Sequence, residues 1–318
     1  MRVLIVKTSS MGDVVHALPA LSDLLHHLPG ASVDWLVEAP FAAIAQLHPG
    51  VKRVLPMAWR KWRRHLAQPA TWRAMAALRS ALRSEPYDLV LDLQGLLKSA
   101  LWGLQARGPV VGYDRKSVRE PLAALFYQRT ARVSRELHAV TRCRQLTAML
   151  VGYPMPTAAP DFGLRVPPMV WQPPEPYAVL IPNASRPEKL WPEARWVAVG
   201  RKLLARGWTP VVVWGNDPEQ TMAERIAADC TGTVPPFLKV GEMAAVLVGA
   251  RCVVGLDTGF SHLAAALGRP TVGIYCDHEP GLAGITGPGP VASIGGKGQV
   301  PKLAEVLALM DRQLGVAG

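Results

Sequence analysis

The run GLDTGFSHLA places an aspartate, a threonine and a glycine where a predicted strand ends and a predicted helix begins: Asp257, Thr258 and Gly259. The free N–H groups and the dipole of a helix N-terminus attract phosphate, and Gly259 has no side chain to hold an anion away from the backbone. Thr258, Ser261 and His262 would add hydrogen bonds. Alternatively, Asp257 or Thr258 merely caps the helix, since both residue types are common N-caps. The residue types alone favour a phosphate site and a helix cap about equally.

Two further loops carry reactive side chains directly after predicted strands. The run SSMGD ends in Asp13, whose carboxylate could take a proton from a substrate hydroxyl. Asp is also among the best N-caps, and by itself the pattern favours a cap for a helix that starts at Val14. The loop from Ser185 to Lys189 supplies a hydroxyl and an ammonium group, although a lone loop lysine is usually just solvated.

Sequence patterns for common cofactors are missing. No G-x-G-x-x-G follows the first predicted strand and no G-x-x-x-x-G-K-[ST] occurs, so neither a nicotinamide enzyme nor a P-loop NTPase is expected. The run Asp277-His278-Glu279 has ligand chemistry, but three consecutive side chains rarely converge on one ion. We therefore expect neither a metal nor another cofactor.

Composition and charge narrow the class of protein. The chain has 318 residues, 49% of them hydrophobic and 19% charged, which fits a globular protein. We expect no membrane span and no secretion signal, and the four scattered cysteines indicate a reduced, cytoplasmic protein. The net charge of +11 favours an anionic partner. Between Glu38 and Glu85 there is no acidic residue, but nine basic ones: Lys52, Arg53, Arg60, Lys61, Arg63, Arg64, Arg73, Arg79 and Arg83.

Strand and helix patterns alternate along the chain and predict an α/β fold with parallel sheets. Short apolar strands are predicted at Val3–Val6, Val33–Val37 and Asp88–Leu93, and the same pattern restarts at Ala178 after a proline-rich stretch. We therefore predict two Rossmann-like domains, 1–155 and 178–301, with a linker at 156–177. A last helical segment, 302–318, could pack back on the N-terminal domain. Ligands of such folds bind at the carboxyl ends of the strands, in the cleft between domains.

Three segments resemble the bacterial lipopolysaccharide heptosyltransferases, most closely the heptosyltransferase I branch. They are the opening MRVLIVKTSSMGDVVHALPAL, the run DLQGLLKS and the run DTGFSHLAAALGRPTVGIY, and the similarity extends over nearly the whole chain. The resemblance implies a glycosyltransferase-B fold, in which two Rossmann-like domains face each other across a cleft. It also implies transfer of L-glycero-D-manno-heptose from ADP-heptose to the Kdo of Kdo-lipid A, with inversion at the anomeric carbon.

The resemblance assigns roles to individual residues. It implies that Asp13 is the general base, which reverses the preference for a cap. The implied donor-binding residues are Ser185, Lys189, Glu219, Asp257, Thr258, Gly259 and His262. Two departures flank the donor site: Ala184-Ser185 stands where relatives commonly carry paired threonines, and Cys276-Asp277-His278-Glu279-Pro280 replaces a usual Gly-Pro-Thr-Asp-Pro.

The acid-free segment is the predicted contact for the acceptor and for the anionic surface of the inner membrane. Its indoles alternate with cations in Trp59-Arg60-Lys61-Trp62-Arg63-Arg64, and indoles and cations both favour the headgroup region. The expected acceptor-binding residues are Ser10, Gly12, Arg60, Arg63, Arg64, Lys98 and Arg119. The residues alone favour a plain solvated basic face about equally, and the resemblance favours acceptor binding. The alternative functions are a heptosyltransferase II with another acceptor sugar and, from a different class, a basic nucleic-acid-binding protein, although no nucleic-acid-binding motif is present.

Overall fold

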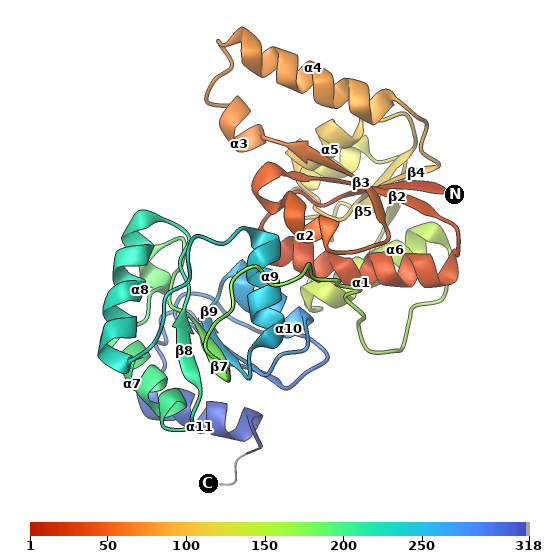
Figure 1. Ribbon diagram of the computed structural model, residues 1–318. Helices are drawn as coiled ribbons and strands as arrows, with labels where there is room; N and C mark the ends of the chain where they lie inside the picture. The colour runs from red at the N-terminus through yellow and green to blue at the C-terminus, as the bar shows by residue number, and fades with distance from the viewer. Residues whose placement is uncertain (316–318) are drawn as a thin grey trace. The chain divides into compact units, whose positions relative to one another are not determined.

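The computed structural model describes residues 1–315 and contains two compact units. One unit runs from Met1 to Gly163, and the other starts at Leu164. Each unit is built around its own parallel sheet with helices on both sides (Figure 1). The predicted fold class, two Rossmann-like α/β domains, is confirmed.

The N-terminal sheet has six parallel strands in the order β3-β2-β1-β4-β5-β6. The strands are β1 (Arg2–Val6), β2 (Ser32–Glu38), β3 (Val51–Met57), β4 (Leu89–Asp92), β5 (Val110–Tyr113) and β6 (Arg129–Ala131). The residues of β1 from Val3 to Val6 are fully buried, because β1 pairs with β2 on one side and β4 on the other. The strand order reverses between β1 and β4, the point where ligands bind in such sheets. The loops after β1 and β4 therefore begin the candidate site.

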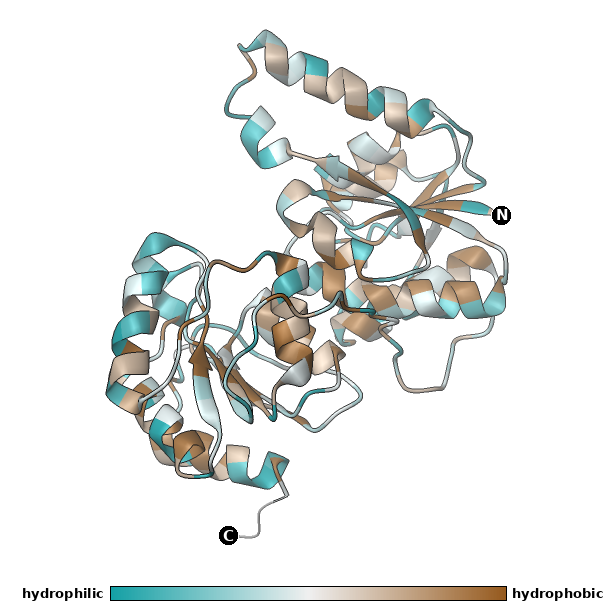
Figure 2. Cartoon of the chain, viewed as in Figure 1, coloured by the Kyte–Doolittle hydropathy of each residue, from teal (hydrophilic) through white to brown (hydrophobic). Residues whose placement is uncertain are grey.

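The helices of this unit differ in how deeply they are buried. They are α1 (Met11–His27), α2 (Ala42–Gln46), α3 (Trp59–Trp62), α4 (Pro69–Arg83), α5 (Leu97–Gly103) and α6 (Ala139–Val151), with short 3-10 turns η1 (Ala39–Phe41) and η2 (Pro121–Phe126). Most of α1 is buried, and it packs against α6. Helix α4 lies at the periphery of its unit, and hydrophilic and hydrophobic residues alternate along it (Figures 1 and 2).

The C-terminal sheet has five parallel strands in the order β11-β10-β9-β7-β8. They are β7 (Tyr177–Ile181), β8 (Thr209–Val212), β9 (Val253–Leu256), β10 (Thr271–Tyr275) and β11 (Val291–Gly295). The helices are η3 (Pro187–Lys189), α7 (Glu193–Leu204), α8 (Asp217–Cys230), α9 (Val240–Gly249), α10 (Gly259–Ala266) and α11 (Leu303–Gln313). Hydrophobic residues gather along the strands in the interior of the unit (Figure 2).

Two features can be compared with the predicted domain organisation: the segment between the two sheets, and the last helix. Residues 153–176, eight of them prolines, contain neither helix nor strand. Helix α11 buries Val306 and Met310 in the core of the C-terminal unit, against α7 and β10. The predicted contact of this segment with the N-terminal domain stays a prediction. The predicted segment 302–318 ends in residues 316–318, outside the described part of the chain.

None of the helices within residues 1–315 combines the length and the hydrophobicity that spanning a bilayer requires.

Candidate functional site

The loop after β1 presents the predicted general base. Helix α1 begins at Met11 with Ser10 as its N-cap, three residues before the predicted start at Val14. Asp13 Oδ2 accepts hydrogen bonds from the Ser10 backbone N–H at 2.6 Å and from Ser10 Oγ at 3.1 Å. Lys7 Nζ lies 4.0 Å from Asp13 Oδ1. The prediction of an N-cap at Asp13 is therefore wrong in position, because Asp13 completes a capping box that Ser10 begins.

Asp13 keeps access to solvent despite this structural task. Its side chain is 31% exposed, and Oδ1 is not the oxygen that binds Ser10. The carboxylate can accept a proton from a bound hydroxyl while its other oxygen still holds the start of α1. Of the two predicted acceptor residues in this loop, Gly12 is buried in the first turn of α1 and Ser10 is exposed.

Gln94, a residue to which our sequence analysis gave no role, fixes the same loop from β4. Its Oε1 accepts the backbone N–H groups of Thr8 and Ser9 at 2.9 and 3.0 Å. Gln94 is 4% exposed. It follows the end of β4, the strand beside β1, so the topology brings its amide under the loop.

Asp92, which we also missed, positions Gln94. It is fully buried, and its Oδ1 accepts the N–H groups of Gln94 and Gly95 at 2.8 and 3.0 Å. Its Oδ2 accepts the hydroxyls of Ser99 at 2.7 Å and Tyr127 at 2.8 Å. Burial raises the pKa of Asp92, and these hydrogen bonds oppose the rise. An Asp at the end of an apolar strand, followed by Leu-Gln-Gly, was the sequence signal for this network.

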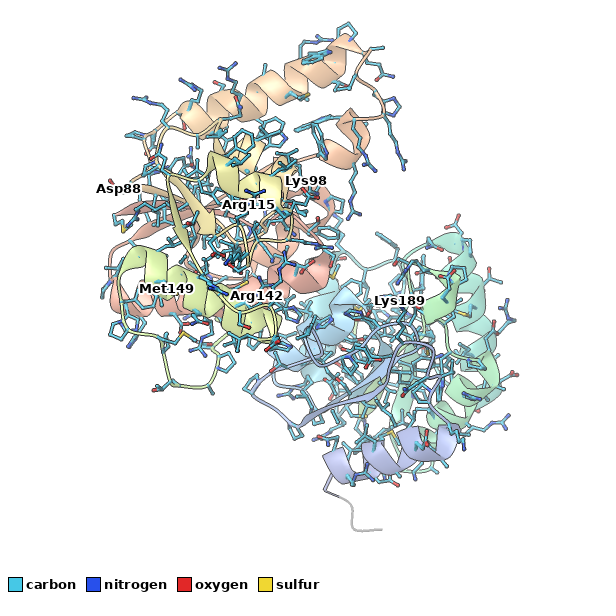
Figure 3. The ribbon with its side chains drawn as sticks, turned by 180° about the vertical axis from the view of Figure 1, so that it is seen from behind. Asp88, Lys98, Arg115, Arg142, Met149 and Lys189 are labelled. Atoms are coloured by element: carbon cyan, nitrogen blue, oxygen red, sulfur yellow. The ribbon has the colours of Figure 1, made fainter. Side chains whose placement is uncertain are left out.

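A buried ion pair lies beside the loop. Glu38, at the end of β2, is 1% exposed, and its Oε1 is 3.8 Å from Lys98 Nζ on α5 (Figure 3). Lys98 Nζ also donates to Ser9 Oγ at 3.3 Å. Burial raises the pKa of Glu38 against the charges of Lys98 and Arg60, and burial lowers the pKa of Lys98. Lys98 is thereby tied to the loop that precedes Asp13, and its role in acceptor binding stays a prediction.

The predicted acceptor-binding cations are only partly brought together. Arg60, Arg63 and Lys98 line a cavity of about 440 Å³ that opens between α3 and α5. Arg64 and Arg119 are exposed and do not line this cavity.

Two members of the acid-free segment have structural tasks instead. Trp62 is buried, with its ring 5.5 Å from that of Trp102, so the prediction that it faces lipid is wrong. Arg53 binds Asp34 at 2.7 Å and therefore does not contribute a free cation to the basic face. Helix α3 has only four residues and turns its second indole, that of Trp62, inward. The alternation of indoles and cations along the chain is therefore not repeated on the surface.

The loop after β9 builds a second cluster in the C-terminal unit. Asp257 follows this strand, and its Oδ2 binds Lys189 Nζ at 2.5 Å (Figure 3 labels Lys189). His262 Nε2 lies 3.5 Å from Asp257 Oδ1. Burial opposes ionisation of Asp257, but hydrogen bonds with His262 and Lys189 outweigh it and lower its pKa to about 2. Asp257 is therefore anionic at neutral pH, and its carboxylate brings Lys189 and His262 close together.

This cluster lies at the start of α10. Thr258 is its N-cap and Gly259 its first residue, so the unpaired N–H groups of the first turn are beside Asp257. Of the two alternatives, Thr258 rather than Asp257 occupies the cap position. Ser261 is not available to a ligand, because it is buried and its hydroxyl donates to the Leu256 carbonyl at 2.6 Å. A lysine, a histidine and a helix N-terminus together can bind a phosphate group.

The two remaining predicted donor residues occupy other loops. Ser185 is exposed in the loop after β7. Glu219 lies in the first turn of α8, where its Oε2 accepts the Gly215 N–H at 2.9 Å while Asn216 Oδ1 accepts the Glu219 N–H at 3.1 Å. Glu219 thus orders the loop after β8, and its Oε1 does not take part in the hydrogen bond to Gly215.

The run Asp277-His278-Glu279, the departure after β10, is tied to neighbouring loops. Asp277 binds Arg186 at 2.7 Å, and Glu279 Oε1 accepts the Lys297 N–H at 3.0 Å. Within residues 1–315, no group of three or more His, Cys, Asp or Glu side chains is arranged to hold a metal ion.

Comparisons with known proteins show to which family this chain belongs. The family model "Glycosyltransferase family 9 (heptosyltransferase)" matches residues 75–306. Lipopolysaccharide heptosyltransferase 1 of Pseudomonas aeruginosa is 44% identical over 290 residues, which cover 90% of this chain and 82% of that protein.

Two solved structures of E. coli heptosyltransferase WaaC are also similar, both at 38% identity and over 98% of this chain. The structure with ADP has a TM-score of 0.91 and is covered completely. The structure with ADP-2-deoxy-2-fluoro heptose has a TM-score of 0.88 and is covered to 98%. The resemblance seen in the sequence is confirmed, and so is the expectation of a glycosyltransferase. The chain belongs to glycosyltransferase family 9, the heptosyltransferases.

Proposed function

We propose that this heptosyltransferase transfers L-glycero-D-manno-heptose from ADP-heptose to the Kdo of Kdo-lipid A, with inversion at the anomeric carbon. The observation that carries the donor assignment is the cluster of Lys189, Asp257 and His262 at the start of α10. A diphosphate fits this chemistry, and similar proteins are solved with ADP and with an ADP-heptose analogue.

In the proposed reaction, the acceptor hydroxyl loses its proton to Asp13 as its oxygen bonds to the anomeric carbon. The bond from that carbon to the diphosphate breaks at the same time, and ADP leaves on the opposite face. Lys189, His262 and the N–H groups at Gly259 offset the charge that develops on the diphosphate. Asp257 acts as a positioning residue, because it holds both Lys189 and His262 before the donor arrives.

The test is product formation from defined substrates. The protein is incubated with ADP-heptose and Kdo-lipid A, and ADP release and the mass of the lipid product are measured; a reaction without acceptor corrects for donor hydrolysis. We expect stoichiometric ADP and a lipid that carries one added heptose. A protein that ignores Kdo-lipid A but modifies the same lipid already bearing a heptose would be a heptosyltransferase II instead.

We further propose that the reaction requires no metal. The supporting observation is that Lys189 supplies a cation, and His262 a ring nitrogen, beside the helix N-terminus at which we propose that the diphosphate binds. Activity should persist in excess EDTA. Loss of activity in EDTA that added divalent metal restores would contradict this scheme and direct attention to Asp277 and His278.

The proposed location is the cytoplasmic face of the inner membrane, with the protein bound peripherally. Arg60, Arg63 and Arg64 are exposed in a segment without acidic residues, and cations near an anionic surface gain about 1 kcal/mol each. Co-sedimentation with vesicles that contain anionic lipid, at several salt concentrations, tests this location. Binding that does not depend on anionic lipid would contradict it.

A further inference from the structure

The N-terminal unit contains two cavities that share three lining residues, Trp59, Lys98 and Leu101. One is the cavity of about 440 Å³ lined by predicted acceptor cations. The other, of about 410 Å³, extends from it between α4 and α5 and has no role in the reaction described above. We call the two together the α3–α5 groove. Each has the volume of a small-molecule site.

The cavity between α4 and α5 is predominantly apolar. One face of α4 contributes residues spaced as i, i+3, i+4 and i+7: Trp72, Met75, Ala76 and Arg79. Trp72 is 57% exposed and Leu101, on α5, is 43% exposed. Apolar side chains that line a hollow and remain this exposed indicate a binding surface rather than a core.

The apolar surface continues beyond the groove on α5 and η2, which pack against each other. Leu122 and Leu125 on η2 are 60% and 70% exposed, and Leu104, the C-cap residue of α5, is 40% exposed. An isolated exposed leucine is ordinary, but several beside an apolar cavity suit contact with hydrocarbon.

Cations occupy the polar end of the groove. Arg79 and Lys98 line the apolar cavity, and Arg60 and Arg63 line the adjoining one. The acidic residue there, Glu120, accepts the Leu97 N–H at 2.6 Å, so its carboxylate is engaged in holding the start of α5. Arginine binds phosphate oxygens bidentately. The groove therefore combines an apolar cavity with a phosphate-binding edge, which is complementary to an anionic amphiphile.

We propose that the α3–α5 groove binds the lipid acceptor as an amphiphile: a phosphate lies at Arg60, Arg63 and Lys98, and an acyl chain enters the cavity between α4 and α5. The proposal rests on the proposed function for the identity of the lipid. It goes further, because it assigns to the acyl chain a site of its own, away from the sugar that is modified.

The first experiment uses alkyl phosphates from butyl to decyl, each below its critical micelle concentration, in calorimetric titration of the full chain. If the chain enters the cavity, affinity should rise on the order of tenfold for each added pair of methylenes. Ala76→Trp fills the cavity and should remove this dependence. Ala77→Trp is the matched control, since Ala77 is an exposed alanine of the same helix that does not line the cavity. Cooperative thermal unfolding of all three proteins shows that they are folded.

The second experiment compares acylated with deacylated acceptor in the transfer reaction. Ala76→Trp should raise KM for the acylated acceptor at least fivefold, and leave KM for the deacylated one and for ADP-heptose unchanged. Affinity that does not change with chain length in the wild type, or an Ala76→Trp protein that matches Ala77→Trp in either experiment, overturns the proposal. Absence of transfer to both acceptors would instead refute the proposed function, and the alkyl phosphate titration would still decide on the cavity.

Discussion

Two substitutions at Asp13 should separate its catalytic role from its structural one. The carboxylate accepts two hydrogen bonds from Ser10 and, in our scheme, a proton from the acceptor. Asp13→Asn keeps an oxygen that can accept from Ser10 but removes the base. Asp13→Ala removes both. The two variants therefore share the loss of proton transfer and differ in the loss of the capping box.

The expected effect on the reaction barrier and the expected effect on stability differ enough to be distinguished. Removal of a general base lowers kcat by roughly 10²–10⁴-fold, which corresponds to about 3–5 kcal/mol in the barrier. Loss of the cap at this partly exposed position costs about 1 kcal/mol. We thus expect both variants to lose turnover to a similar degree, and Asp13→Ala alone to destabilise the first turn of α1.

The assay for the first effect is ADP release at saturating substrates. Amide hydrogen exchange of the peptide that contains residues 11–18 measures the second effect. Cooperative thermal unfolding serves as the control for folding, and unchanged affinity for ADP shows that the donor cluster, which lies in the other unit, is intact. If Asp13→Asn retains turnover within about threefold of the wild type, while Asp13→Ala loses it, then Asp13 acts only through the capping box and the assignment of the base is refuted.

Three further outcomes follow from the charges at the two sites. Lys189→Ala should raise the KM for ADP-heptose by about 10–100-fold, the effect of losing one hydrogen bond to a charged group, and an unchanged donor KM would remove Lys189 from the donor site. The pKa of Asp257, about 2 against an ordinary 3.8, contributes about 2 kcal/mol of stability at neutral pH. Because the pKa of Asp257 is lower in the folded state than in the unfolded state, this contribution is complete above about pH 4 and disappears as the pH falls towards 2. In urea unfolding, Asp257→Asn should therefore be less stable than the wild type at pH 7 and closer to it near pH 3. An equal loss of stability at both pH values would be inconsistent with the ion pair. Replacing Arg60, Arg63 and Arg64 together with Ser should raise the acceptor KM and weaken binding to anionic vesicles, without a change in the donor KM. If neither the acceptor KM nor vesicle binding changes, the segment is only a solvated face.

The central strands of both sheets could be predicted because they are apolar throughout. Val3–Val6 and Val253–Leu256 are fully buried between two neighbouring strands, and burial on both faces requires an unbroken apolar run. Edge strands lack this signal. In β3, Lys52 and Pro56 are exposed, and β11 is half-buried along its whole length, so their mixed composition gave no strand pattern.

The loops of the candidate site could be predicted from a topological rule. Residues that follow buried parallel strands gather at one edge of the sheet, and Asp13, Lys189 and Asp257 all follow such strands or their loops. The rule places loops but does not assign partners. That Asp257 binds Lys189, 68 residues away in the chain, depends on the strand order β10-β9-β7, which spacing alone does not determine.

The hydrogen bonds that hold the loop before Asp13 could not be predicted from the sequence for a similar reason. Their chemistry nevertheless explains why a glutamine and an aspartate occupy positions 94 and 92. Gln94 accepts two backbone N–H groups of the loop after β1, a task that a glutamate oxygen would also perform. Asp92, however, is fully buried next to it, and burial already raises the pKa of that carboxyl. A second carboxylate would add like-charge repulsion in a region of low dielectric. A neutral amide supplies the acceptor without that charge, so the loop can be held rigidly while Asp13 remains the carboxylate that we propose as the base.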